Sequence, residues 1–287
     1  MTIIPFLKEQ NFLINILLTG ILFTLPSASF SSEFDYPDSQ NNIIDSVNDK
    51  LYDYYAFDKC RSLQAKPFNH QSQKKKLIII GDSQGCDFLN GMIENGYLRN
   101  YQIQFRFIPY ACQKVPYENI NVYISAKHQR FCTTTKRLDS LKKVKQQIAN
   151  ADLVVFAALW KPAVAKKLPK IFQYLHIRKQ QRIVVIGYKF FGGISAKKYA
   201  NLPNNKRRLA RVNVGHKALK INAILNSSLP NNVIFVNPHK LICGNSTSCP
   251  VFTSALELIS YDGRHLTKAG ARYIGKIIFQ KTPLGSL

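Results

Sequence analysis

The sequence has 287 residues, of which 46% are hydrophobic and 20% are charged, and these values exclude a disordered chain. Lysine and arginine number 40 against 16 acidic residues, so the formal net charge is +24. A charge of this size favours polyanionic partners such as an anionic glycan or a membrane surface, although the lysines could equally form a solvated face. No nucleic-acid-binding motif is present, so we expect no nucleic acid partner.

The first 29 residues differ from the rest of the chain. The run from Phe12 to Leu25 carries no charge and is shorter than the roughly 20 residues needed to cross a bilayer. Lys8 precedes this run and small residues follow it, which is typical of a secretory signal peptide cleaved after Ser29. An uncleaved membrane anchor is the alternative. In both cases we expect the folded part outside the cytoplasm, in the periplasm or secreted.

The next residues, 30–73, are polar and aromatic without a clear period, and we interpret them as a loose N-terminal arm. The main domain is predicted at 74–287, where buried-strand patterns alternate with helical ones. Strands are predicted at 77–80, 101–109, 152–160, 182–187 and 232–237. Helices are predicted at 84–98, 133–150, 161–179 and 206–226 and at the C-terminal end, with an irregular insert at 188–205.

This alternation defines the expected fold class. Buried strands that alternate with helices form a mainly parallel sheet covered on both faces. We therefore predict an α/β fold, a three-layer α/β/α sandwich around a five-stranded sheet. In such sheets, functional sites form beyond the carboxyl ends of the strands.

The six cysteines favour disulfides, because their number is even and the chain reads as exported. Cys243 and Cys249 flank a short turn-forming loop, and Cys112 and Cys132 bracket a polar segment, so we favour these two pairs. Cys60 and Cys86 remain as the third pair. A zinc site is the alternative, but no Cys-x-x-Cys or histidine pair has ligand spacing, and no metal is predicted.

The stretch "LIIIGDSQG" places Ser83 directly after a buried strand. A serine at this point is a good helix N-cap, which is the simple structural interpretation. It is also a candidate nucleophile, but a serine hydroxyl needs a base, and the base needs an orienting acid.

The stretch "DGRHL" near the C-terminus supplies both groups. Asp262 and His265 are three residues apart, so one loop can let the carboxylate bind one ring nitrogen and leave the other for a serine. Each motif alone is weak. Their order, with strand–GDS–helix first and Asp-x-x-His–helix last, is more specific.

With these motifs the sequence resembles the SGNH (GDSL) hydrolase superfamily, and more narrowly the SGNH domain fused to membrane acyltransferases that O-acetylate cell-surface glycans. The similar strings are "IIIGDSQ", "ADLVVFAALW", "RIVVIG", "VIFVNPHKLICGNSTSCP" and "SYDGRHLTKAGA". The resemblance implies a flavodoxin-like SGNH hydrolase fold. It also implies Ser83 as nucleophile, His265 as base, Asp262 as its orienter and the Ser83 amide as one oxyanion donor.

The sequence departs from the family pattern in two respects, of which the first concerns the oxyanion site. Members of the superfamily carry Gly-x-Asn after the third strand, whereas this chain has "AALWKP", with Trp160 and no asparagine. Trp160 is therefore a candidate contact for a sugar ring or a core residue. Gly96 is our candidate for the glycine of the second family block. The second departure is that we expect no fused membrane domain in a chain of 287 residues, so a transferase would depend on a separate membrane protein as acyl donor.

The sequence thus predicts an exported serine esterase or O-acyltransferase that acts on O-acyl esters of envelope or extracellular carbohydrate, with acetyl favoured. No metal or organic cofactor is expected. Two alternatives remain open: a catalytically silent glycan-binding or assembly protein on the same scaffold, and a secreted lipase.

Overall fold

A computed structural model describes residues 49–287 except 65, 195–197 and 200. The predicted leader, 1–29, and most of the predicted arm lie outside the described residues. No helix among the described residues is both long and apolar enough to cross a membrane.

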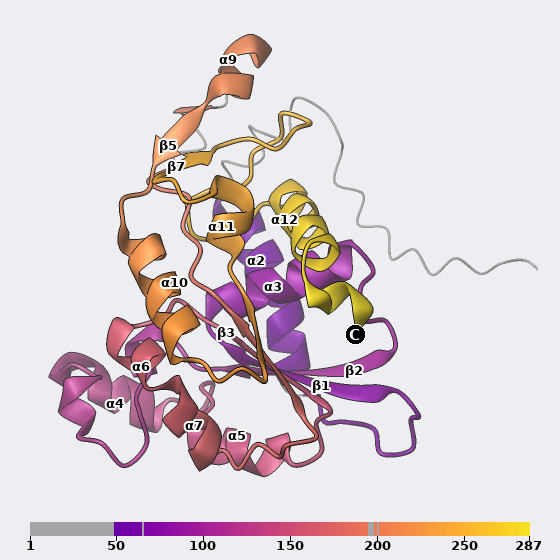
Figure 1. The fold of residues 1–287 in the computed structure, drawn as a ribbon, viewed down its shortest axis with the longest axis vertical. Coiled ribbons are helices and arrows are strands. Elements are labelled where there is room, and N and C mark those ends of the chain that lie inside the picture. The colour runs from indigo at the N-terminus through magenta and orange to yellow at the C-terminus, as the bar shows by residue number, and fades with distance from the viewer. Residues whose placement is uncertain (1–48, 65, 195–197, 200) are drawn as a thin grey trace, which may run out of the picture. The chain divides into compact units, whose positions relative to one another are not determined.

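A five-stranded parallel sheet with the order β2-β1-β3-β4-β6 organises the domain (Figure 1). The predicted α/β fold is therefore confirmed. Its strands are β1 (Lys75–Gly81), β2 (Tyr101–Phe107), β3 (Leu153–Ala157), β4 (Arg182–Ile186) and β6 (Val233–Val236). All five correspond to strands predicted from the sequence.

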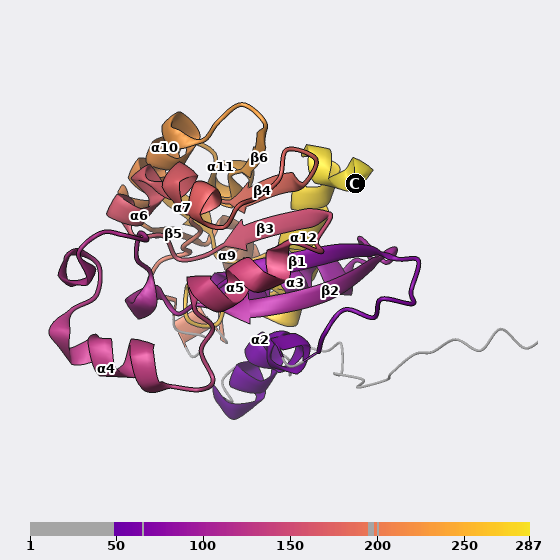
Figure 2. The same cartoon turned by 90° about the horizontal axis from the view of Figure 1, so that it is seen from below.

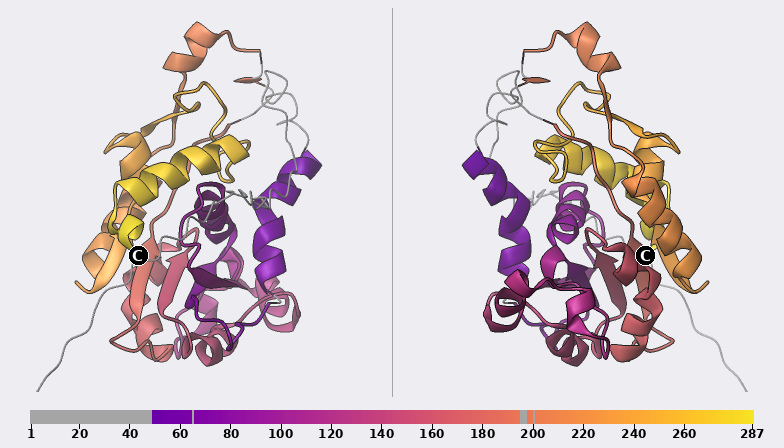
Figure 3. Two further views of the ribbon diagram at one scale, coloured as in Figure 1. Left: turned by 90° about the vertical axis from the view of Figure 1, so that its right-hand side faces the viewer. Right: turned by 90° about the vertical axis from the view of Figure 1, so that its left-hand side faces the viewer.

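Helices cover both faces of this sheet, as the two turned views show (Figures 2 and 3). Successive side chains of a strand point to opposite faces, so Leu77 and Ile79 join one core cluster while Ile78 and Ile80 join the other. The first cluster includes α3 (Ser83–Glu94) and α12 (Lys268–Gln280). The second includes α5 (Leu141–Ile148), α6 (Pro162–Lys166), α7 (Leu168–Tyr174) and α10 (Lys217–Ser228).

Three of the predicted helices are interrupted in the structure. The helix predicted at 133–150 is divided into α4 (Ala126–Thr134) and α5, because the hydroxyl of Ser140 accepts from the Lys143 amide and starts a new helix there. Pro169 stands at the start of α7, where its missing amide separates this helix from α6.

The prediction of one continuous helix at 206–226 is also wrong. It is replaced by α9 (Asn204–Leu209), a short strand β5 (Arg211–Asn213) and α10. Strand β5 pairs antiparallel with β7 (Ser248–Pro250), which follows α11 (Pro238–Cys243). Gly215, with φ of +64°, follows β5 and precedes α10.

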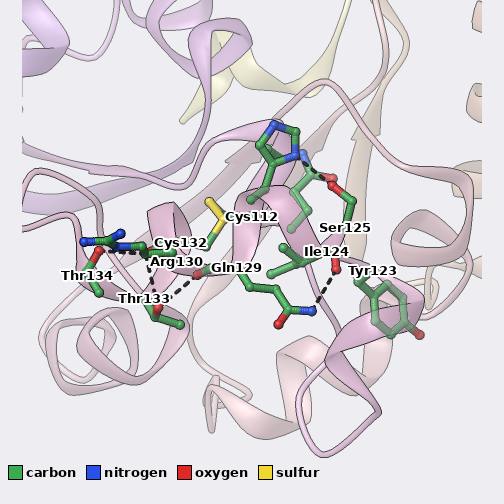
Figure 4. The surroundings of a disulfide bond; sticks show 12 residues. Cys112, Tyr123, Ile124, Ser125, Gln129, Arg130, Cys132, Thr133 and Thr134 are labelled. Atoms are coloured by element: carbon green, nitrogen blue, oxygen red, sulfur yellow. Dashed lines mark hydrogen bonds between the residues drawn. A yellow bond between two sulfur atoms is a disulfide. The ribbon is translucent and has the colours of Figure 1, made fainter.

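Residues 49–64 form helix α2 (Asp49–Gln64), whereas the sequence suggested a loose arm. The Cys60–Cys86 disulfide joins α2 to α3. The other two disulfides are Cys112–Cys132 and Cys243–Cys249, so the three pairs favoured from the sequence are all present. Figure 4 shows how Cys112–Cys132 attaches the loop after β2 to α4.

Candidate active site

The predicted nucleophile lies where β1 turns into α3. Gly81 ends the strand, and a side chain there would collide with the carbonyl oxygen of Ala157, 1.8 Å from an ideal Cβ. Asp82 then caps the helix by accepting from the Gln84 amide at 3.0 Å. Ser83 is therefore the first helical residue, half-buried at the amino end of α3, where the helix dipole favours negative charge.

Asp82 also ties the end of β1 to the end of β3. Its carboxylate is 4% exposed and accepts from the Leu159 amide at 2.9 Å and from the Gln113 side chain at 3.4 Å. Burial raises the pKa of Asp82 to about 6, against the hydrogen bonds from Gln84 and Leu159, which lower it. Asp82 thus has a structural role, as a cap that orients the turn before Ser83.

The second predicted element, the Asp262–His265 pair, is formed in the structure. Nδ1 of His265 lies 2.7 Å from Oδ2 of Asp262, while Oδ1 accepts from the amides of Arg264 and His265 at 2.8 and 2.7 Å. One carboxylate therefore fixes both the backbone turn and the imidazole. With Nδ1 engaged as donor, Nε2 remains as the nitrogen that can accept a proton.

The pair holds its charges in a partly buried environment. Burial opposes ionisation of Asp262, but the hydrogen bonds from His265 and Arg264 outweigh it and hold the pKa at about 2. For His265, burial lowers the pKa, yet the Asp262 hydrogen bond and the charges of Asp87 and Asp262 raise it above its ordinary value. Asp262 thus makes the imidazole a stronger base.

A glycine shapes this loop. Gly263 has φ of +82°, and a Cβ there would lie 1.6 Å from the Gly192 carbonyl oxygen. Its own carbonyl accepts from the Phe191 amide at 2.8 Å. The hydroxyl of Ser260 donates to the His265 carbonyl at 2.6 Å and accepts from the Gly263 amide at 2.9 Å. The turn between the acid and the base is therefore closed by its own hydrogen bonds.

Three side chains hold the same loop against the first turns of α3. Gln84 donates to the Arg264 carbonyl at 3.2 Å, and Asp87 accepts from the Leu266 amide at 3.1 Å. Lys189, which follows β4, donates to the Arg264 carbonyl at 2.7 Å and pairs with Asp87 at 2.5 Å. The residues on both sides of His265 are thus bonded to the helix that begins at Ser83.

Sequence reasoning missed Lys189, because it belongs to the insert that we interpreted as irregular. Asp87 is also not among the residues predicted for the site. Its spacing of four residues from Ser83 was the available signal, because such residues share one face of a helix.

Helix α2 contributes to the site from the other side. The ring of Phe57 contacts the imidazole of His265 edge-on, with centroids 5.4 Å apart. Asn90 of α3 donates to the Tyr55 carbonyl at 3.1 Å, and the Cys60–Cys86 disulfide adds a covalent link three residues after Ser83. The segment expected to be a loose arm therefore packs against His265.

Two residues predicted for the oxyanion or substrate site lie elsewhere. Gly96 follows the far end of α3, and a helix of 12 residues is about 18 Å long, so Gly96 does not share a site with Ser83. Its φ of +67° serves the turn before β2 instead. Trp160 is 4% exposed and donates its indole N–H to the Ile186 carbonyl at 2.9 Å. The structure therefore places this ring in the core and not on an open sugar-binding surface beside Ser83.

The described residues contain one cluster of metal-type ligands, formed by His239, Cys243 and Cys249. The two sulfur atoms are joined in a disulfide and are not thiolates. This cluster therefore offers no thiolate ligand.

The comparison with protein families identifies the chain. The sequence model described as "SGNH domain (fused to AT3 domains)" matches residues 47–280, so the chain belongs to this SGNH family. The match includes α2, in agreement with its place in the domain. Membership makes the chain a relative of esterases and acyltransferases, in a family that also contains non-catalytic members.

No curated protein matches the chain. Among solved structures, a candidate platelet activating factor from Streptococcus pneumonia is similar at 14% identity with a TM-score of 0.34, over 81% of this chain and 92% of that one. The N-terminal part of the protein BF1531 from Bacteroides fragilis, which contains a phosphatase domain, is similar at 14% identity with a TM-score of 0.30, over 78% and 55%.

Proposed function

We propose that this protein is an exported serine esterase or O-acyltransferase that acts on O-acyl esters of carbohydrate in the cell envelope or outside the cell. The observation that carries the proposal is the Asp262–His265 pair, bonded at 2.7 Å and attached on both sides to the helix that starts at Ser83. Such a pair supplies the acid and base that a serine nucleophile needs.

In the proposed reaction, the Ser83 hydroxyl attacks the ester carbonyl while Nε2 of His265 takes the hydroxyl proton. The Ser83 amide, at the amino end of α3, donates to the developing oxyanion. His265 then gives its proton to the leaving sugar oxygen, and an acyl-Ser83 ester remains. A water molecule or a second sugar hydroxyl attacks this ester, and the proton returns through His265 to Ser83. Asp262 stabilises the imidazolium in both halves.

Hydrolysis and transfer share the acyl-enzyme, and they differ in whether water or an acceptor sugar reaches it. The family description, which refers to acyltransferase-fused domains, favours a carbohydrate ester as substrate and a separate membrane protein as acyl donor for transfer. The net charge of +24 favours an anionic glycan. The three disulfides support an oxidising compartment outside the cytoplasm.

A catalytically silent glycan-binding protein is the second candidate. It is favoured by one observation: the Leu159 amide, at the end of the third predicted strand where the superfamily has its oxyanion asparagine, is already bonded to Asp82 at 2.9 Å. One missing oxyanion donor lowers the rate of an acyl-transfer enzyme by about 10²–10³. The silent protein would retain the fold and lose the reaction.

Hydrolysis of p-nitrophenyl acetate by the purified protein tests the proposal. The wild type and a control, Ser227→Ala, should turn the ester over, while Ser83→Ala should not. Ser227 is an exposed serine whose hydroxyl bonds only within α10, which makes it a matched control. Equal inertness of all three proteins, together with binding of an envelope glycan, would favour the silent scaffold.

A further inference from the structure

A cavity lies on the face of the sheet opposite α3. Its volume is about 300 Å³, and it lies at the carboxyl ends of β1 and β3. Ile80 and Phe156 contribute from β1 and β3, and Ala158 from the residue after β3, while Leu168 and Ile171 contribute from α7. Both cysteines of the Cys112–Cys132 disulfide, drawn in Figure 4, are also among the residues that line the cavity. The residues proposed for catalysis are not among its walls.

With the exception of Lys114, the polar side chains that line this cavity are hydrogen-bonded within the protein. Gln113 donates to the Leu159 carbonyl at 3.0 Å and accepts from the Lys161 amide at 3.1 Å. Asp139 accepts from the Phe107 amide at 2.9 Å. The Thr133 hydroxyl donates to the Gln129 carbonyl of its own helix at 2.9 Å, as Figure 4 shows.

These contacts leave few polar partners for ordered water in the interior of the cavity. A buried water needs two to four polar partners, and this volume corresponds to about ten water molecules at about 30 Å³ each. A cavity of 300 Å³ lined mainly by apolar side chains is instead within the range of sites for small organic ligands.

The opening of the cavity carries a positive charge. Three of its lining residues are exposed, namely Lys114, Thr133 and Ser140, so the cavity reaches solvent beside them. Among the described residues, the Lys114 ammonium has no hydrogen-bond or ion-pair partner, whereas the hydroxyls of Thr133 and Ser140 are bonded within the protein. An apolar chamber with one free cation at its rim fits a ligand with an alkyl chain and an anionic end.

We propose that this cavity binds a free fatty acid, with the alkyl chain inside and the carboxylate beside Lys114. The proposal does not rest on the proposed esterase function, because none of its contacts involves Ser83 or His265. Binding at this site would be reversible and non-covalent.

Displacement of the anionic fluorescent probe anilinonaphthalene sulfonate by decanoate from the full chain tests the proposal. We expect one saturable site, and affinity for shorter acids that rises about fourfold with each added methylene until the cavity is full. Ala158→Leu places a larger side chain inside the cavity and should weaken decanoate binding at least tenfold. Val164→Phe, from the α6 wall, gives a second obstruction if the first variant does not fold.

The head group is tested separately. Lys114→Ala should weaken binding of decanoate but not of decanol, while Lys127→Ala, an exposed lysine outside the cavity lining, should change neither. Ser83→Ala should bind decanoate as the wild type does. Loss of binding in Ser83→Ala would overturn the proposal by moving the ligand to the catalytic site. Unchanged binding in folded Ala158→Leu or Val164→Phe, or no binding by the wild type, would also overturn it.

Discussion

The ammonium of Lys189 lies 2.5 Å from the carboxylate of Asp87, and the two side chains are 6% and 1% exposed. Asp87 belongs to α3, Lys189 follows β4, and both also bond the backbone next to His265. A buried ion pair of this kind needs further hydrogen bonds to offset desolvation, and the backbone beside His265 supplies them. The pair therefore links the helix that begins at Ser83 to the loop that carries His265.

Lys189→Met should destabilise the protein by about 3–5 kcal/mol, because it leaves the Asp87 carboxylate buried without a counter-charge. The double variant Lys189→Met, Asp87→Leu should recover part of this loss in urea unfolding, yet it should remain slow as an esterase because the loop has lost two anchors. Arg272→Ala, which breaks the more exposed pair with Glu94, serves as control and should cost less than about 1 kcal/mol. Equal losses of stability for Lys189→Met and Arg272→Ala would contradict the role of the Lys189–Asp87 pair in linking α3 to the loop that carries His265.

The rate of ester hydrolysis should rise with pH through a single ionisation above the ordinary histidine pKa. His265 must be neutral to act as base, and its pKa is raised by the Asp262 hydrogen bond and by the charges of Asp87 and Asp262. Asp262→Asn should move the midpoint to lower pH and reduce kcat by about 10⁴. A pH–rate profile of both proteins measures this, and an unchanged midpoint would exclude Asp262 as the partner of the base.

Gly263→Ala should reduce both stability and activity, because the new methyl group meets the Gly192 carbonyl in a left-handed backbone conformation. Gly215→Ala is a matched control. Its φ is +64° and no atom lies within 4 Å of an added Cβ, so it carries the backbone strain of about 1 kcal/mol without the collision. The midpoint temperature of thermal unfolding should be well below that of Gly215→Ala in the Gly263→Ala variant. The opposite order would show that the loop can move away freely.

Asp82 should make the protein less stable as pH rises from about 4 to about 6. Its pKa is about 6 in the folded state because of burial and near 3.8 when unfolded, so the native state binds more protons in this window. A difference of this size corresponds to about 3 kcal/mol. Asp262, with a pKa of about 2, acts in the opposite direction, but only below this window. The free energy of unfolding, measured in urea, should fall less between pH 4 and pH 7 for Asp82→Asn than for the wild type. An equal fall in the two proteins would contradict the raised pKa of Asp82.

The strands could be predicted from the sequence because each is a continuous apolar run, as parallel strands buried on both faces must be. The helices were harder to delimit. The run at 133–150 has one apolar face throughout, yet Ser140 and its capping bond divide it. Local periodicity does not reveal which serine will cap. Helix α2 was missed because its stability comes from the Cys60–Cys86 link and from packing on α3, neither of which leaves a clear period.

At the site, the contact between Asp262 and His265 could be predicted because the two residues share one short loop. The disulfide pairs followed from an even count, from the loop between Cys243 and Cys249 and the polar segment between Cys112 and Cys132, and from the two cysteines that remained. Lys189 could not be predicted, because its partners lie far away in the sequence and meet only through the sheet order. Whether Trp160 lies in the core or on the surface could not be predicted either, because its contacts also depend on the order of the strands. Its position after a strand is compatible with a surface or a core ring, and the bond to Ile186 on the neighbouring strand decides between them.

Covalent labelling by a fluorophosphonate, followed by peptide mass spectrometry, tests the central claim most directly. The account predicts one adduct per wild-type chain, on Ser83, with the same yield in Ser227→Ala, none in Ser83→Ala, and much slower labelling in His265→Ala. An unlabelled Ser83 in a wild-type protein that hydrolyses acetate esters, or a full adduct on another residue, would contradict it.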